Sequence, residues 1–322
     1  MERFINVAPE DRSPRGLTRK LLERPHLCEK IRAMIPDPDR AHLITYTVTI
    51  QERDLALRLG IPLYGSDPSL FYLGGKSGGR EVFEKAGASY PVGLENLRSM
   101  DEVRAAIAEM RRRKPSMRKA MVKLNDGISG EGNALLDLEG LPDPSDTSYA
   151  SATEERLKSM VFEASSVTFE TFSRGIEETG GIVEERIEGR DFLSPSVQMR
   201  VSPLGDVEIL STHDQLLGGP SGGSFLGSKF PADPGYGPLI ASEAAKIGER
   251  LAALGALGRF AVDFVVVRGD EDQWEPYAIE INLRLGGTTH PFQILQFLTE
   301  GRFYPEDGVF RAPSGQEKYY VA

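Results

Sequence analysis

The chain has 322 residues, enough for one large domain or two of moderate size. It carries 38 Lys and Arg against 48 Asp and Glu, a net charge of −10 with a pI near 5.1, which argues against sequence-independent binding to nucleic acid or to anionic membranes. Its single cysteine, Cys28, excludes an intrachain disulfide framework and a cysteine-based zinc cluster. With no membrane-length apolar run and no secretory-type apolar core in the first residues, the expectation is a cytoplasmic enzyme.

The first 75 residues are predicted to alternate between helix and strand. A helix over residues 16–34 should be interrupted at Pro25, because proline cannot donate the hydrogen bond that a helix interior needs. A β-rich stretch over 41–49, a helix over 51–60 and a strand over 61–65 are expected to follow.

From Lys76 the pattern restarts with a short helix that should end at Gly87, the residue type favoured just past a helix. Ser99 and Glu102 have the spacing of a capping box at the start of the next helix, which Pro115 would end. Strands over 119–124, 134–138 and 181–189, a polar loop over 141–153 and a helix over 157–162 complete this part.

The last third of the chain favours antiparallel strands. Segments 194–202 and 205–215 alternate well enough to pair across a turn at 203–205, and a helix is predicted over 241–255. Segments 260–268 and 274–284 should form a long hairpin around an acidic turn.

The end of this hairpin carries the sharpest chemical signal. Since side chains alternate along a strand, one face should hold Ile279, Ile281 and Leu283, and the other Glu280, Asn282 and Arg284. An apolar face suits a core, whereas a carboxylate, a carboxamide and a guanidinium on one face point to a site.

On the partner strand Asp263 interrupts an apolar run, and a buried carboxylate is costly unless it is paired or bound to a metal. Oxygen ligands from Asp263, Glu280 and Asn282 would suit Mg²⁺ shared with substrate phosphates. The alternative is structural: these residues would pair with arginines such as Arg259 and Arg284 and hold the strands together.

A glycine-rich loop follows the strand that carries Lys123. Its backbone N–H groups could close over phosphate oxygens, and Lys123 would supply a mobile positive charge. The residues of this loop that would contribute are Gly127, Ser129, Gly130 and Gly132. The alternative is an ordinary hairpin turn beside a solvent-exposed lysine.

Two further motifs suggest nucleotide or acyl chemistry. The run GGKSGGR at 74–80 is not a P-loop, because Leu70 stands where that motif needs glycine, yet Lys76 could contact phosphate from the head of a helix. The run GPSGG at 219–223 matches the G-x-S-x-G pattern of serine hydrolases around Ser221, but glycines and prolines follow it instead of the required helix.

Taken together, these segments resemble the ATP-grasp ligases, and most closely the carboxylate–amine ligases of the pheganomycin-type peptide ligase group. The segments that carry the resemblance are LGGKSGGR, MVKLNDGISGEGNA, EERIEGRD, VDF and EINLRLGGTTHP. It covers residues 76–312, and residues 1–75 resemble the later part of the domain that precedes ATP-grasp. Members of this group extend further at both ends, so the chain is expected to be a fragment or a short member.

The resemblance implies an α+β (α/β) fold in which two α+β subdomains clasp a nucleotide. The expected boundaries are a partial pre-ATP-grasp domain over 1–75, an N-terminal subdomain with its lid loop over 76–183, and a C-terminal subdomain with the metal site over 184–322. Lys76 and Lys123 would contact nucleotide phosphates under the loop at 127–132.

The resemblance also implies roles for the remaining site residues. Glu184 would meet the adenine amino group, the backbone near Ile187 the adenine ring, and Asp191 the ribose. Asp263, Glu280 and Asn282 would hold Mg²⁺, with Mn²⁺ as a substitute, and Arg284 would contact a phosphate or a substrate carboxylate. Lys123, Glu280 and Arg284 are therefore the expected catalytic residues.

The implied reaction is ATP-dependent joining of a small-molecule carboxylate to an amine, from amino acids or peptides, through an acyl phosphate with release of ADP and phosphate. No nucleic acid or membrane partner is expected, and a homo-oligomer is compatible with the sequence. The alternatives are a nucleotide-binding regulatory or scaffold module without ligase activity and, more remotely, a serine hydrolase acting through Ser221.

Overall fold

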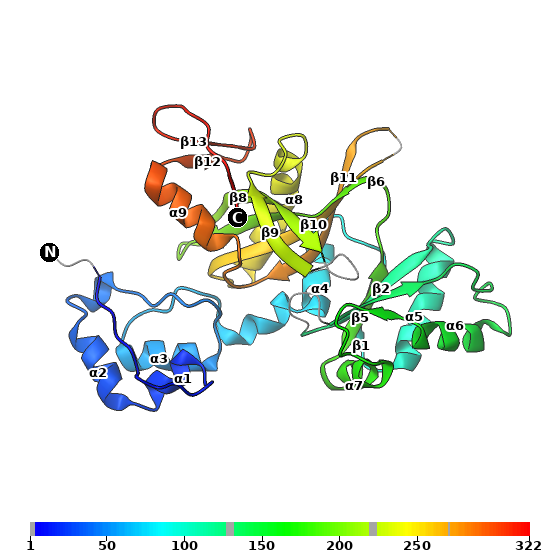
Figure 1. The fold of residues 1–322 in the computed structure, drawn as a ribbon, viewed down its shortest axis with the longest axis horizontal. Coiled ribbons are helices and arrows are strands. Elements are labelled where there is room, and N and C mark those ends of the chain that lie inside the picture. The colour runs from blue at the N-terminus through cyan, green and yellow to red at the C-terminus, as the bar shows by residue number, and fades with distance from the viewer. Residues whose placement is uncertain (1–3, 127–131, 219–223, 270) are drawn as a thin grey trace.

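A computed structural model of the chain describes residues 4–126, 132–218, 224–269 and 271–322. Three parts are visible in Figure 1: an N-terminal group of helices, a lobe built on a seven-stranded sheet, and a lobe built on a five-stranded sheet. The helix α4 (Lys76–Ala86) lies between the two sheet lobes.

The N-terminal part is helical in the residues that the structure describes. Its elements are α1 (Leu17–Leu22), α2 (Pro25–Ala33), the 3₁₀ helix η1 (Pro38–Arg40), α3 (Ile50–Leu59) and the 3₁₀ helix η2 (Pro68–Gly74). The predicted break at Pro25 is confirmed, because α2 begins at that proline. The predicted strands over 41–49 and 61–65 are wrong: a parallel bridge of Leu43 to Leu63 is what the two segments form, and two short segments without a sheet neighbour gain little from pairing.

The smaller sheet has the strand order β1-β5-β2-β3-β4. Its strands are β1 (Gly93–Leu97), β5 (Gly181–Glu185), β2 (Lys119–Leu124), β3 (Asn133–Asp137) and β4 (Val161–Phe162). The helices α5 (Met100–Arg113), α6 (Tyr149–Lys158) and α7 (Phe169–Thr179) pack with it around one apolar core. Ser99 accepts a hydrogen bond from the Glu102 amide, 3.2 Å away, so the predicted start of α5 is confirmed.

The helix predicted over 157–162 lies earlier in the chain. It is α6, and residues 161–162 form β4 instead. Tyr149, Thr153 and Leu157 recur every four residues and are all buried, so they form the stripe that holds α6 to the lobe. The polar residues between them hid this stripe, and the loop predicted over 141–153 therefore ends at Ser148.

The larger sheet has the order β11-β10-β7-β8-β9-β14, and β6 also pairs with β10. Its strands are β6 (Arg190–Leu193), β7 (Pro195–Val201), β8 (Val207–Gly218), β9 (Ser224–Phe230), β10 (Gly258–Arg268), β11 (Trp274–Asn282) and β14 (Tyr320–Val321). The predicted pairing of β7 with β8 and the predicted β10–β11 hairpin are confirmed. The helix α8 (Gly237–Ala253) begins four residues before the predicted position and packs its buried side chains on this sheet.

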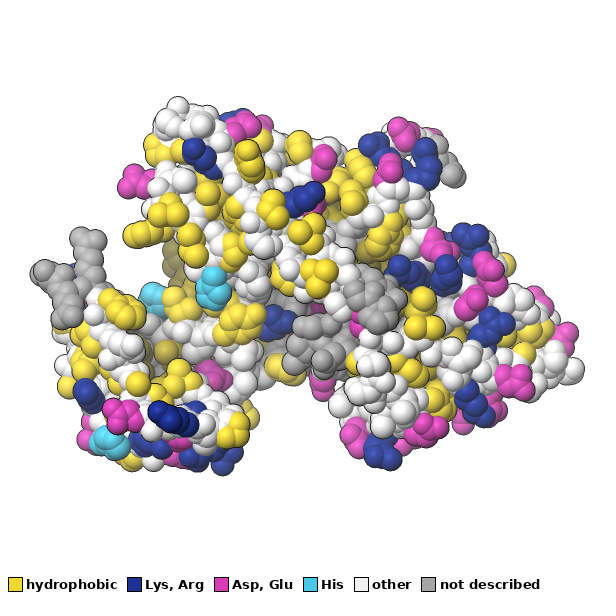
Figure 2. All heavy atoms as spheres, viewed as in Figure 1, with side chains coloured by type: hydrophobic (Ala, Val, Ile, Leu, Met, Phe, Trp, Pro, Cys, Tyr) yellow, Lys and Arg dark blue, Asp and Glu magenta, His cyan; other side chains and the backbone are white. Residues whose placement is uncertain are grey.

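The C-terminal segment adds α9 (Thr289–Thr299) and the hairpin of β12 (Arg302–Tyr304) and β13 (Val309–Arg311). A cluster of Phe230, Phe292, Phe303 and Phe310 joins it to the larger sheet. His213 is fully buried, and its Nε2 atom lies 2.9 Å from the Tyr320 hydroxyl. This contact holds the last strand, β14, in position, so the role of this histidine is structural. Three large apolar side chains of α9, those of Ile294, Phe297 and Leu298, are exposed, and hydrophobic side chains are seen over this part of the molecule in Figure 2.

A β-bulge interrupts β11 at the point where the site begins. Asp263 pairs with Glu280 but the next residue, Phe264, pairs with Ala278, so Ile279 is an extra residue. Ile281 and Ala278 belong to the main core of this lobe, while Ile279 packs against Ile187, Val265 and Val267. The prediction that Ile279 and Ile281 share a face is therefore wrong, because simple alternation does not survive a bulge.

The helix α4 links the lobes. Val82 and Phe83 lie in the core of the seven-stranded lobe, yet the same helix also contacts β1 and β5 of the smaller sheet. The boundary expected between residues 183 and 184 falls inside β5, a strand of the smaller sheet.

Among the described residues, no helix combines the length and the apolar character that crossing a membrane requires.

The bulge makes a prediction about stability. Ile281 is 1% exposed, so Ile281→Ala should lower the free energy of unfolding by about 2–5 kcal/mol, the range for truncating a core isoleucine. Ile279→Ala should cost less than half as much, because Ile279 is only partly buried. Chemical denaturation of both variants measures this difference, and equal losses would contradict the bulge.

Candidate functional site

Charged side chains from two elements meet at the end of the β10–β11 hairpin. Lys76 is the first residue of α4, and its ammonium forms an ion pair with the Glu280 carboxylate on β11. The Lys76 side chain is buried, with 6% exposed, and that of Glu280 is 28% exposed. The helix can begin here because Gly78 has no side chain: a Cβ at Gly78 would lie 2.1 Å from the Tyr72 carbonyl oxygen.

Beside this pair runs a chain of hydrogen bonds along the same edge. Arg284 donates through Nη2 to the Asn282 Oδ1, 2.9 Å away, and Asn282 donates through Nδ2 to the Asp263 Oδ2, also 2.9 Å away. Arg284 also donates to the Leu285 carbonyl and lies 6.0 Å from the ring centroid of Tyr46 in the N-terminal part. The structure thus brings together the four residues that the hairpin was predicted to present and Lys76.

The two carboxylates of this cluster have opposite pKa shifts. Burial and the negative charge of Glu280 raise the pKa of Asp263 to about 6, against a hydrogen bond from Ser196 and the positive charges of Lys76 and Arg284. Burial also acts to raise the pKa of Glu280, but the charges of Lys76, Lys123 and Arg284 outweigh it and hold the pKa below its usual value. Lys123 therefore acts on the same site as Lys76.

Lys123 reaches the site from β2 of the smaller sheet. Its Nζ lies 2.5 Å from the Glu184 Oε1 on the neighbouring strand β5, and both side chains are buried. The other Glu184 oxygen lies 3.1 Å from Nη1 of Arg80, which is on α4 one turn after Lys76. Each lysine of the site thus has a carboxylate partner, Glu280 for Lys76 and Glu184 for Lys123.

Ile187 and Asp191 lie farther along the segment that leads from β5 into the larger sheet. Ile187 is buried with Val265 and Val267, so this segment has an apolar wall. Asp191, by contrast, is exposed, has a φ of +52°, and faces the Arg268 guanidinium at 3.6 Å.

The glycine loop after Lys123 is bounded by a regular hairpin. Lys123 pairs with Asn133, and the Leu124 amide donates to the Gly132 carbonyl at 2.9 Å. The other predicted loop residues, Gly127, Ser129 and Gly130, lie outside the described residues, as does Ser221. The strand β9 begins at Ser224, so the helix that a nucleophile elbow needs directly after its serine does not follow.

The donor chemistry around Glu280 fits a hard divalent cation. Asp263, Glu280 and Asn282 offer carboxylate and amide oxygens, the ligand types that Mg²⁺ prefers, and two facing carboxylates of like charge gain from a cation between them. Among the described residues there is no group of three or more His, Cys, Asp and Glu that could hold a metal, so an amide or a substrate oxygen has to contribute.

Sequence reasoning missed two groups that support the site. Arg80 follows Lys76 by four residues in a helix, a spacing that places both on one side, and this periodicity could have identified it. Ser77 donates to the Asn125 Oδ1 at 2.7 Å and so ties α4 to the end of β2, but no sequence signal marks that long-range pair.

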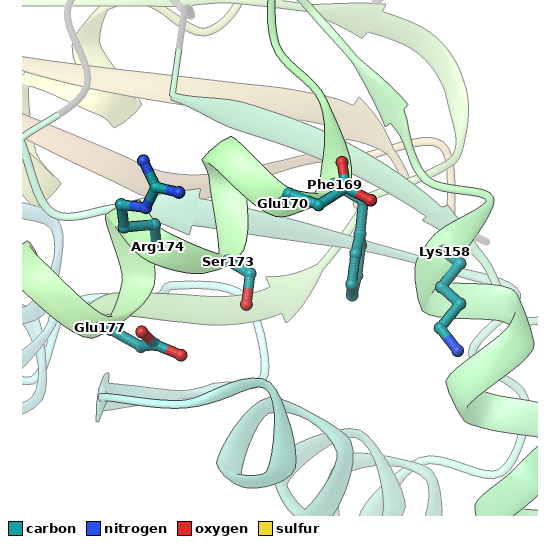
Figure 3. A pocket seen from close by; sticks show the side chains of 6 residues that line it. All are labelled: Lys158, Phe169, Glu170, Ser173, Arg174 and Glu177. Carbon is teal, nitrogen blue, oxygen red and sulfur yellow. The ribbon is translucent and has the colours of Figure 1, made fainter.

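An open hollow in the described surface lies elsewhere, between α6 and α7 (Figure 3). Its lining consists of Lys158, Phe169, Glu170, Ser173, Arg174 and Glu177. It contains none of the residues predicted for the site, and its mixed charges along exposed helix faces give it no evident chemistry.

Comparisons with known proteins bear on this geometry. Residues 151–305 match a family model described as "IQCH-like, ATP-grasp". The chain is 34% identical to the L-propargylglycine–L-glutamate ligase of Streptantibioticus cattleyicolor, in an alignment that covers 99% of this chain and 63% of the ligase. The chain thus spans less than two thirds of that relative.

Two solved structures have a similar fold. Biotin carboxylase from Campylobacter jejuni, in a complex with β,γ-ATP, superposes with a TM-score of 0.59 at 14% identity, over 86% of this chain and 54% of that chain. The biotin carboxylase domain of Hydrogenobacter thermophilus 2-oxoglutarate carboxylase, solved with MgADP, ADP and bicarbonate, gives 0.56 at 14% identity, over 87% and 55%. These matches confirm the fold expected from the sequence.

The shared carboxylate of Glu184 makes a prediction about stability. Glu184→Gln should lower the free energy of unfolding by about 3–5 kcal/mol, because two buried cations, Arg80 and Lys123, would lose their common anion. Lys123→Met should cost less, since Arg80 would still balance Glu184. Chemical denaturation compares the two variants, and a Glu184→Gln protein as stable as the wild type would contradict this arrangement.

Proposed function

From the ATP-grasp fold of this chain, we propose that it is an ATP-dependent carboxylate–amine ligase that forms an amide bond through an acyl phosphate. The observation that carries the proposal is the meeting of Lys76 and Lys123, from different lobes, beside Asp263, Glu280 and Asn282. The similarity to the ligase named above, with 34% identity over 99% of this chain, supports the same activity.

In this proposal Lys76 and Lys123 bind the phosphates of ATP. Both side chains are buried, so a phosphate that replaces their carboxylate partners would meet two desolvated ammonium groups, a setting in which charge pairs are strong. The residues around Gly127, Ser129, Gly130 and Gly132 would cover the phosphates with backbone N–H groups.

Asp263, Glu280 and Asn282 would hold Mg²⁺, for which Mn²⁺ could substitute. The metal would neutralise phosphate charge during phosphoryl transfer. The chain's own contribution is to keep Glu280 ionised through Lys76, Lys123 and Arg284 and to orient Asp263 through the Asn282 amide.

The nucleoside would bind along the segment from β5 to β6. Glu184 would meet the adenine amino group, the backbone at Ile187 would meet the ring beside the apolar wall of Val265 and Val267, and Asp191 would reach the ribose. The Arg268 that now faces Asp191 would compete for that carboxylate.

The chemistry requires no covalent enzyme intermediate. An oxygen of the substrate carboxylate attacks the γ-phosphorus of ATP, the bond to the β–γ bridging oxygen breaks, and ADP leaves. The amine nitrogen then attacks the acyl carbon, the carbon–oxygen bond to phosphate breaks, and the amine loses a proton. Positioning and charge neutralisation are the means of catalysis, and Arg284 is placed to contact the substrate carboxylate or its phosphate.

The substrates we propose are amino acids or small peptides, one presenting a carboxylate and the other an amine. An ATP-consuming ligase with one cysteine suits the cytoplasm.

The test is ADP release with hydroxylamine as a surrogate amine and a panel of amino acids as carboxylates, since an acyl phosphate is trapped as a hydroxamate. Wild type should release ADP in step with hydroxamate. Glu280→Ala should lower the rate about 10²-fold or more, the scale for losing a preorganised electrostatic contact.

Glu275→Ala, on the same strand but exposed, is the matched control and should retain the wild-type rate. Glu280→Ala turnover within a few-fold of wild type would contradict the assigned site. ADP binding without hydroxamate for any carboxylate would favour the nucleotide-binding module over the ligase.

A further inference from the structure

Arg80 connects the two lobes at the base of the proposed nucleotide site. It lies on α4, whose apolar side belongs to the core of the seven-stranded lobe, but its guanidinium enters the five-stranded lobe and is 3% exposed. An arginine is always charged, so a position this buried requires anionic or carbonyl partners.

The partners come from the strands β1 and β5 and from the segment that precedes β1. Arg80 donates through Nε to the Glu95 carboxylate at 3.0 Å, and through Nη1 to the Pro91 carbonyl at 3.0 Å and to Glu184 at 3.1 Å. Its guanidinium also lies 4.9 Å from the centroid of the Tyr90 ring. Gly93 leaves room for it, since a Cβ there would lie 2.9 Å from Arg80 Nη2.

Glu184 therefore serves two cations at once. One of its oxygens faces Arg80 and the other faces the Lys123 ammonium, and the Glu184 side chain is 3% exposed. With Glu95, the four groups carry two positive and two negative charges. Were Arg80 removed, Lys123 would be the remaining cation on Glu184, and the pair would be held more firmly at low local dielectric.

We propose that Arg80 is a positioning residue for Lys123: by sharing Glu184, it limits how firmly that carboxylate holds the ammonium and so keeps Lys123 available to a nucleotide phosphate. This inference rests on the proposed function. A positioning role differs from a purely structural link between the lobes in one respect: the effect of Arg80 on nucleotide binding then depends on the presence of Lys123.

A double-mutant cycle on ADP binding, measured by calorimetry with Mg²⁺, tests the inference. Arg80→Met should raise the Kd for ADP about tenfold, within the range for coupled neighbours in one ionic network. In a Lys123→Met background the same substitution should change the Kd less than about twofold. Arg80→Lys should restore part of the affinity, because it returns one charge to Glu184.

The matched control is Arg111→Met. Arg111 also donates to backbone carbonyls and lies 5.6 Å from an aromatic ring, in the same lobe, and it should leave the Kd for ADP unchanged. Where Arg80→Met does not fold, Arg80→Lys takes its place, with an expected rise in Kd of about threefold that again vanishes without Lys123.

Equal changes in Kd with and without Lys123 would overturn the inference and leave Arg80 a structural link. An Arg80→Met protein that folds and binds ADP as tightly as wild type would also overturn it, while the proposed function would stand. Failure of the wild type to bind ADP would instead overturn the proposed function, and this inference with it.

Discussion

The ion pair between the Lys76 ammonium and the Glu280 carboxylate is the interaction around which the site is organised. It joins the start of α4 to the end of β11, and it places a cation among groups that would otherwise be two facing carboxylates. Lys123 and Glu184 repeat the arrangement in the other lobe. An unpaired buried charge is costly, so each carboxylate stabilises the buried ammonium of its lysine. A nucleotide phosphate could then replace the carboxylate as the partner of that ammonium.

This arrangement has a consequence for ligand binding. A divalent cation that binds Glu280 would free Lys76 for a phosphate. A phosphate that binds Lys76 would in turn free Glu280 for the cation. Binding of one should therefore favour binding of the other, which is the thermodynamic meaning of coupling between two sites. In the proposed role of Arg80, Lys123 is kept available in a similar way, because Arg80 shares the Glu184 carboxylate that would otherwise pair with Lys123 only.

Much of this could be predicted from the sequence because it follows from local rules. Alternation along β11 predicted that Glu280, Asn282 and Arg284 share a face, and the break at Pro25 and the cap at Ser99 followed from residue type. The glycine loop was recognised from composition, although most of it lies outside the described residues. The contacts expected of Glu184, Ile187 and Asp191 with the nucleoside came from the family resemblance alone, and all the roles toward ATP and the metal stay proposals.

What escaped prediction depends on contacts between distant residues. The bulge at Ile279 is set by how β11 meets β10, and it moves that side chain from the core to the wall beside Ile187. The start of α6 depends on a buried stripe that contains a polar residue, Thr153. The role of Arg80 depends on its hydrogen bonds to Glu95 on β1 and Glu184 on β5, which lie far from it in the sequence.

The measurement that tests the central claim most directly is the affinity of the nucleotide-free protein for Mn²⁺, compared between wild type and Lys76→Met by electron paramagnetic resonance. If Lys76 occupies the position of a cation on Glu280, its removal should raise the Mn²⁺ affinity about three- to tenfold, the scale of coupling within an ionic network. Lys246→Met, which removes a surface lysine paired with Glu243, should leave the affinity unchanged. An unchanged or weaker Mn²⁺ affinity in Lys76→Met would contradict the account.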